Sequence, residues 1–347
     1  MALSQEQRAG LLRAQLVALV RDLVGVTVEA TTVGANATAV SGDDAYVLSQ
    51  EANPATLAGA LTWSLRQDAS HLVLILDDVS SDVARMARHF DHPIEVRSVS
   101  GATSVVAVAS ALPTPLDAPE APELVNQLRA AGLDVVVEDG IVRGEVRGLE
   151  VARLVLWPEE TGGDGLLHLE AGVGRFDRDA VAAMHQGEPP TTTLERTVGM
   201  VSAERVPGRS MHPLSRLARD RWLRWSVLGD PALVGAVELE PIETTVSRDS
   251  VRDVSPAAAK GRSSDGEPMV VVCSAGVDLS LVPVAADTRE RCAPGARLVL
   301  AVPVRDRVPT LDRLAALLSD PAEVVTLPSP WDLPDGGVGS DVEGTAP

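Results

Sequence analysis

A proline-rich segment constrains the fold of this chain more than any other feature of its sequence. Four prolines fall within Leu112–Pro122, and because proline cannot donate a backbone hydrogen bond, neither a helix nor a central strand can run through them. A length of 347 residues also favours two domains, at roughly 150 residues per domain. We therefore predict an N-terminal domain over residues 1–111, a linker over 112–121 and a second domain after it.

Apolar spacing predicts alternating helices and strands on both sides of the linker. In the first domain we expect the order helix, three strands, helix, strand, helix and two strands, with His71–Leu76 as a fully buried strand. The second domain is predicted over residues 122–241 together with 268–327. The polar stretch 242–267 is predicted to be a flexible insert, and 328–347 a disordered acidic tail. The predicted class is α/β (mixed α+β), with mixed β-sheets flanked by helices and an αβββαβ-like order in each half.

Charge and lysine content exclude several classes of function. The formal charge of −19 repels nucleic acid at long range. Lys260 is the single lysine, and it lies in the stretch predicted to be flexible. Mechanisms that need a P-loop lysine, a Schiff base or a Ser-Lys dyad are therefore disfavoured. The sequence shows no nucleotide-binding glycine motif and no nucleophile elbow, so it indicates no cofactor.

Three further features bear on the compartment. The first residues do not resemble a signal peptide, and no apolar run reaches the length of about 18 residues that spans a bilayer. The two cysteines, Cys273 and Cys292, are too few for a disulfide framework. We therefore expect a cytoplasmic protein with no membrane partner, and we expect Cys273 to be buried in a strand.

The αβββαβ order resembles the core of the restriction-endonuclease-like fold. That resemblance implies two carboxylates holding Mg²⁺ and a Glu-x-Lys triplet on the third strand, but Tyr46–Glu51 has no such triplet, and Glu170 is followed by Ala171 and Gly172. Other segments are similar to an uncharacterised bacterial protein family for which no activity is implied. They are Gly172–Asp179, His212–Leu217, Arg221–Arg224 and Gly276–Leu279.

The segment from His168 to Asp179 is the first candidate site. On a strand, His168 and Glu170 point away from the core, and Asp177 caps a following helix near Arg175 and Arg178. A helix N-terminus with two arginines can bind an anion. The same residues also fit a tight strand-to-helix turn held by salt bridges. Arg305 is a further ligand candidate, because it follows a predicted strand on the side where open α/β sheets bind ligands.

A second candidate is a divalent-metal site. Glu145, Glu150 and Glu170 could offer oxygen ligands to Mg²⁺ or Mn²⁺ if their strands are neighbours. Glu145 and Glu150 differ by an odd number, so on one regular strand they would face opposite sides unless a bulge near Gly148 intervenes. Solvated carboxylates at a sheet edge are the alternative.

A third candidate is the arginine-rich helix predicted over residues 213–227. Its arginines offer a surface for phosphate, RNA or a partner, and its tryptophans could stack on bases. The alternative is an amphipathic helix whose tryptophans fill the core and whose arginines pair with the protein's own carboxylates. The arginines concerned are Arg216, Arg219, Arg221 and Arg224.

The first functional hypothesis is a non-enzymatic binding or scaffold protein on a nuclease-like fold that lacks the metal-lysine site. Its partner would be another protein or a second copy of the chain. The alternatives are a metal-dependent nuclease or phosphoesterase using Glu150, Glu170 and His168, and a nucleic-acid binder using the arginine-rich helix.

Overall fold

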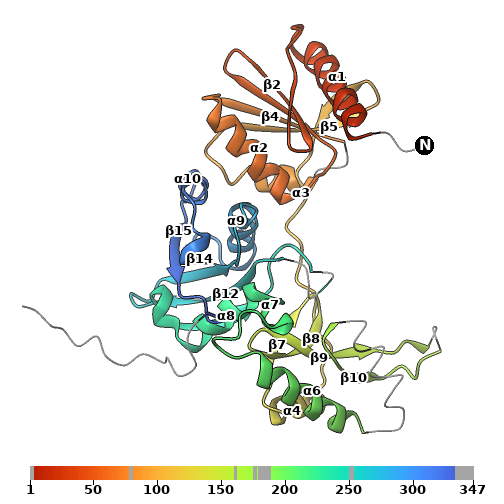
Figure 1. The fold of residues 1–347 in the computed structure, drawn as a ribbon, viewed down its shortest axis with the longest axis vertical. Helices are drawn as coiled ribbons and strands as arrows, with labels where there is room; N and C mark the ends of the chain where they lie inside the picture. The colour runs from red at the N-terminus through yellow and green to blue at the C-terminus, as the bar shows by residue number, and fades with distance from the viewer. Residues whose placement is uncertain are drawn as a thin grey trace, which may run out of the picture. The chain divides into compact units, whose positions relative to one another are not determined.

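The computed structural model describes residues 4–77, 81–159, 162–174, 178, 189–248, 250 and 254–332. Its strands form three sheets with helices packed on them, which confirms the predicted α/β class (Figure 1). The chain divides into two compact units. The first unit contains the residues through Pro113, Val277–Leu300 and Arg307–Val324. The second contains Thr114–Gly276, Ala301–Asp306 and the residues from Val325 onward.

The N-terminal sheet forms in the predicted element order. Its strands follow one another as β1-β2-β3-β4-β5-β6, with β3, β4 and β5 parallel and the other neighbours antiparallel. The elements are α1 (Gln5–Val24), β1 (Thr31–Val33), β2 (Asn36–Ser41), β3 (Asp44–Ser49), α2 (Pro54–Arg66), β4 (His71–Leu76), α3 (Ser81–Ala87), β5 (Ile94–Ser100) and β6 (Thr103–Val106).

Helix α1 covers one face of this sheet. Ser4 caps the helix in a reciprocal capping box with Gln7, and Gly25 ends it in the left-handed conformation. Leu16 and Leu19 pack with alternate residues of the strands, such as Tyr46. Because side chains alternate along a strand, the remaining buried residues of β3 and β4 face the opposite side, where α2 contacts both strands. The sheet is therefore buried on both faces.

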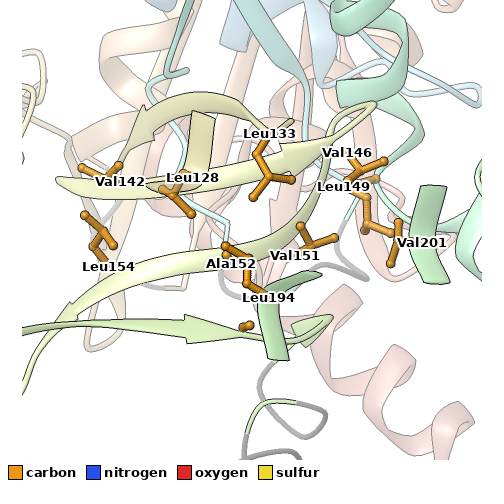
Figure 2. Packing of buried hydrophobic residues seen from close by; sticks show 12 residues of the cluster. Leu128, Leu133, Val142, Val146, Leu149, Val151, Ala152, Leu154, Leu194 and Val201 are labelled. Carbon is orange, nitrogen blue, oxygen red and sulfur yellow. The ribbon is translucent and has the colours of Figure 1, made fainter. Parts of the chain in front are cut away.

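The second sheet is an antiparallel meander in the order β10-β9-β8-β7. One face carries a core of leucine, valine and alanine on which α4 and α6 pack (Figure 2). Its opposite face carries charged residues and forms the candidate site. The elements are α4 (Pro122–Ala130), β7 (Asp134–Glu138), β8 (Ile141–Val146), β9 (Leu149–Leu156), β10 (Leu167–Ala171) and α6 (Pro190–Glu204).

The third sheet follows the order β11-β12-β13-β14-β15. Strand β12 lies within the stretch predicted to be a flexible insert, so that prediction is wrong for Ala257–Ser263. It pairs with strands on both sides. The elements are α7 (Pro213–Arg216), α8 (Arg219–Gly229), η2 (Pro231–Val234), β11 (Ala236–Ile242), β12 (Ala257–Ser263), β13 (Pro268–Cys273), α9 (Leu281–Cys292), β14 (Arg297–Pro303), η3 (Val304–Asp306), α10 (Pro309–Ala316) and β15 (Glu323–Leu327).

The elements from α8 to β15 repeat the order of the N-terminal sheet: helix, three strands, helix, strand, helix, strand. Short identities accompany the repeat. Leu72–Leu74 of β4 matches Leu298–Leu300 of β14, and Pro93-x-Glu-Val recurs as Pro321-x-Glu-Val. The second αβββαβ copy therefore begins at α8. The prediction had placed it directly after the linker, where the structure has four consecutive antiparallel strands.

Helices α9 and α10 pack within the first unit, against α2 and α3. Phe90, after α3, forms an antiparallel bridge with Leu318, after α10. The segment 277–324 had been predicted to belong to the second domain, and most of it instead completes the first unit. Helical periodicity predicts that a helix has an apolar face, but it does not say which sheet or helix will cover that face.

Candidate functional site

The polar face of the second sheet places charged residues in two rows. Asp134, Glu145 and Glu150 lie opposite one another across β7, β8 and β9. Arg143 and Arg153 form the neighbouring row, with Glu170 of β10 paired to Arg153. Side chains of one row point to the same face because antiparallel partners do so. The strands alone therefore bring carboxylates and arginines together on one face of the sheet.

Helix α8 adds two arginines, three residues apart and therefore on one helix face. Arg224 donates to Oε1 of Glu138 at 2.6 Å and to Oε2 of Glu145 at 3.1 Å, and Arg221 donates to Oε2 of Glu138 at 2.6 Å. Burial alone would raise the pKa of Glu138. The charges and hydrogen bonds of Arg224 and Arg221 outweigh that effect and hold the pKa well below its ordinary value.

Glu150 faces three arginines. Its Oε2 accepts from Nη1 of Arg143 at 2.5 Å and its Oε1 accepts from Nη1 of Arg178 at 2.9 Å. Nη2 of Arg248 lies 3.7 Å from Oε2, which is too far for a hydrogen bond. All four side chains are nearly inaccessible to solvent. One buried carboxylate is thus shared by three buried guanidinium groups.

We call the whole assembly the arginine–glutamate cluster. It contains five buried arginines and three buried glutamates, which leaves a difference of two positive charges (5 − 3 = 2). Partly exposed Asp139 and Glu170 contact its edge, at 3.4 Å from Arg143 and 3.8 Å from Arg178. The members are Glu138, Arg143, Glu145, Glu150, Arg178, Arg221, Arg224 and Arg248.

Several N–H groups of the cluster have no hydrogen-bond partner in the described part of the chain. They are Nη1 and Nη2 of Arg248, Nε of Arg143, Nε of Arg178 and Nη1 of Arg221. Burial lowers the pKa of Arg248 to about 10, and the nearby charge of Arg221 acts in the same direction. A buried N–H group without a hydrogen bond is costly, and among the described residues this corner of the cluster is short of hydrogen-bond acceptors.

A tight turn and a buried arginine hold the sheet against α8. Gly148, with φ of +77°, packs so closely on the backbone of Arg221 that a Cβ atom would lie 2.4 Å from its carbonyl group. Arg205 donates to the carbonyl oxygens of Arg147, Leu214, Leu217 and Ala218 and lies over the ring of Trp222. Burial lowers the pKa of Arg205 to about 9. Arg205 therefore fixes the chain just before α8, the helix that carries Arg221 and Arg224.

Two residues of the first predicted site lie in different surroundings. His168 stacks on Trp157, with 4.0 Å between ring centroids, and its Nε2 lies 2.8 Å from Asp164. Glu170 instead pairs with Arg153 at 3.3 Å and lies 3.8 Å from Arg178. Arg178 is a buried member of the cluster. Arg175 lies outside the described residues. Arg305 pairs with Asp332 at 3.2 Å and with Asp306 at 3.7 Å.

The predicted helix over residues 213–227 is broken into α7 and α8 at Leu217 and Ala218, where Ala218 has φ of +45°. Arg221 and Arg224 are buried in the cluster, so they cannot form the predicted nucleic-acid surface. Arg219 donates to the carbonyl oxygens of Ser210 and Ser215 and lies over Trp331, and Arg216 is exposed. Arg221 and Arg224 instead pair with the protein's own carboxylates, as the alternative interpretation of this helix predicted.

Glu145, Glu150 and Glu170 do not form the predicted metal site in the described part of the chain. Glu145 and Glu150 do share a face, because the chain reverses at Arg147 and Gly148 and makes them cross-strand partners. Guanidinium groups, however, contact both oxygens of Glu150, where a cation would bind. Among the described residues, no three His, Cys, Asp or Glu side chains are grouped closely enough to share a metal ion.

Cys273 is fully buried in β13, as predicted, and burial raises its pKa to about 12.

Within the part of the chain that the structure describes, every helix is too short or too polar to traverse a lipid bilayer.

No family model, curated protein or solved structure matches this chain. The geometry of the cluster is therefore the starting point for function.

Sequence reasoning missed Arg143, Arg248 and Glu138 as members of the cluster. Arg143 and Glu138 flank the Asp139-Gly140 turn, and their alternation with valines along two strands marks the polar face. Arg248 lies in the connection between β11 and β12, outside helices and strands, and carries no such signal.

Proposed function

We propose that this protein is a non-enzymatic binding protein whose second unit recognises a phosphoryl group through the arginine–glutamate cluster. The observation that carries the proposal is the set of buried guanidinium N–H groups, those of Arg248 among them, that have no hydrogen-bond partner among the described residues. Arginine presents a planar fork of donors that matches the oxygens of phosphate. A phosphate monoester carries about 1.5 to 2 negative charges at neutral pH, and among the buried members of the cluster arginines outnumber glutamates by two (5 − 3 = 2).

The absence of a nucleophile in the cluster supports binding rather than catalysis. The cluster contains arginines and carboxylates that are already hydrogen-bonded to those arginines, and no Ser, Cys or His belongs to it. A general base must reach a proton, and each glutamate here already accepts a hydrogen bond from at least one guanidinium group. A metal-dependent phosphoesterase would also need carboxylates free to bind the ion.

The proposal keeps the resemblance to the restriction-endonuclease-like fold as a statement about architecture. The order αβββαβ occurs twice, once from α1 and once from α8, which supports that resemblance. The third strands of the two copies are β3 and β13, and neither carries a Glu-x-Lys triplet. We therefore propose a bacterial, cytoplasmic protein that uses a nuclease-like scaffold without the nuclease's metal site.

A thermal-shift titration with inorganic phosphate and sulfate tests the proposal, using Arg248→Met as the probe variant. Arg262→Met is the matched control, because Arg262 is an exposed arginine on β12. A ligand present at 100 times its Kd stabilises the folded protein by about 2.7 kcal/mol. We expect phosphate to raise the Tm of the parent and of Arg262→Met, and to leave Arg248→Met unchanged. A parent without a shift, or equal shifts in all three proteins, would rule the proposal out.

A further inference from the structure

A pocket in the second unit lies where the edge strand of the second sheet, β7, meets the edge strand of the third, β11. Its volume is about 340 Å³, which is within the range of small-molecule sites. The walls come from β7, β8, α8 and β11. The lining residues are Asp134, Val135, Val136, Glu145, Arg224, Trp225, Leu228, Gly229, Leu239 and Pro241.

The charged groups of this pocket favour a positively charged ligand. Glu145 is buried, and its Oε1 has no hydrogen-bond partner among the described residues. Nε of Arg221 lies 4.0 Å from that oxygen, too far for a hydrogen bond. Arg224 is the single cation among the described lining residues, and it is already shared between Glu138 and Glu145. Asp134 adds a second carboxylate at the rim.

Asp134 is exposed at its edge strand, yet the neighbouring atoms remove part of the hydration of its carboxyl group and raise its pKa. The indole of Trp225 donates a hydrogen bond to it, and Arg224 adds a favourable charge, but neither outweighs the loss of hydration. A cation that bound beside Asp134 would supply the missing stabilisation of its charged form.

The rest of the lining is apolar. Val135, Leu228, Leu239 and Pro241 offer a surface for a hydrocarbon or an aromatic ring, and the half-exposed indole of Trp225 offers a face for stacking. Arg147 approaches that ring at 5.8 Å, so the indole already attracts a cation. An amphipathic ligand with one ammonium group therefore fits both parts of the pocket.

We propose that this pocket binds a small primary amine, with its ammonium group between Asp134 and Glu145 and its apolar part against Trp225 and Leu239. This inference does not rest on the proposed phosphoryl site: it shares Glu145 with the cluster but uses neither Arg248 nor the other guanidinium N–H groups that lack a partner among the described residues. The two proposals require ligands of opposite charge, so each can fail alone.

Isothermal titration with phenethylamine tests the proposal, with 2-phenylethanol as the uncharged analogue of the same shape. We expect the amine to bind the full-length protein at least 10-fold more tightly than the alcohol. Asp134→Asn should weaken amine binding at least 5-fold and leave the alcohol unaffected. Glu240→Gln is the matched control, because Glu240 is an exposed carboxylate of β11 outside the lining.

Trp225→Phe provides a second readout that does not depend on the carboxylates. In the parent, amine binding should change tryptophan fluorescence, and the change should largely disappear in Trp225→Phe, which keeps an aromatic ring for packing. The proposal is wrong if the alcohol binds as tightly as the amine, if Asp134→Asn binds the amine like the parent, or if the amine does not bind. Phosphate binding in the same preparations reports separately on Arg248.

Discussion

Arg224 and Arg248 lie in one cluster, but their surroundings differ. Arg224 donates to two carboxylates, and although burial alone would lower its pKa, Glu138 and Glu145 raise it above the ordinary value. Nη1 and Nη2 of Arg248 have no hydrogen-bond partner among the described residues, and burial lowers the pKa of this arginine. Arg224 forms hydrogen-bonded ion pairs with two carboxylates, whereas Arg248 lies 3.7 Å from Glu150, which it shares with two other arginines, without a hydrogen bond to it.

We therefore expect opposite effects on stability from the same substitution. Arg224→Met leaves Glu138 and Glu145 buried with a missing partner, and it should lower the free energy of unfolding by about 3–5 kcal/mol. Arg248→Met removes a buried cation that has no hydrogen bond to its carboxylate and leaves Glu150 with two arginines, so it should raise the free energy of unfolding by about 1 kcal/mol in phosphate-free buffer. Urea unfolding followed by circular dichroism measures both. Destabilisation by Arg248→Met would mean that Arg248 is held for stability instead of binding.

The burial of Arg221 and Arg224 could not be predicted from the spacing of residues in their own helix. The spacing of Arg221 and Arg224 places both on one helix face, and that was visible in the sequence. Which face is covered depends on a sheet more than 70 residues earlier, whose carboxylates at Glu138 and Glu145 face the helix. Periodicity describes one element at a time, so it cannot identify a partner that lies across the fold.

At the scale of elements, a buried ionic contact joins α3 to α9. Asp287 of α9 is fully buried and accepts hydrogen bonds from Arg85, at 2.9 Å to Nη2. Nε2 of His89 lies 3.1 Å from the same carboxylate. Arg85 also contacts Asp82, Ser110 and the carbonyl oxygen of Ala111. This network holds the C-terminal helices within the first unit.

Asp287→Ala should therefore destabilise the first unit strongly. It leaves Arg85 buried without its main partner, so we expect the free energy of unfolding to fall by about 3–5 kcal/mol. Asp82→Ala is the comparison, because the Asp82 side chain is 72% exposed, and it should cost less than about 1 kcal/mol. Hydrogen exchange should show α9 amides losing protection in Asp287→Ala. Similar losses in both variants would contradict this account.

The order of the N-terminal sheet could be predicted from the sequence, whereas strand β12 could not. Alternation, caps and buried runs predicted the whole order of the N-terminal sheet. Strand β12 was missed because Ala257–Ser263 contains small and polar residues instead of the large apolar residues typical of a buried strand. Its Gly261 lies so close to β11 that a Cβ atom would be 1.9 Å from the carbonyl oxygen of Glu238. Small residues in a central strand reflect crowding by neighbours. The turn at Asp265 and Gly266 was the available signal for a hairpin.

At the scale of the whole molecule, the cluster should make the protein sensitive to acid. Glu138 has a lowered pKa in the folded state, so its contribution to stability is complete above the ordinary glutamate pKa of 4.5 and is lost as pH falls below it. We expect the free energy of unfolding to decrease steadily from about pH 5 downward. Glu138→Gln should be less stable than the parent at pH 7 and should show a shallower decrease. An unchanged slope in the variant would place the acid sensitivity elsewhere.

The division of the first unit between the two ends of the chain has a consequence during translation. Helix α3 is synthesised long before α9, because 163 residues lie between Pro113 and Val277 (276 − 114 + 1). At about 5–20 residues per second, the ribosome needs about 8–33 s to add them. During that interval the nascent N-terminal sheet presents Arg85 and Phe90 without Asp287 and Leu318. The nascent chain therefore exposes a surface that segments from its last fifth, Val277–Leu300 and Arg307–Val324, later cover.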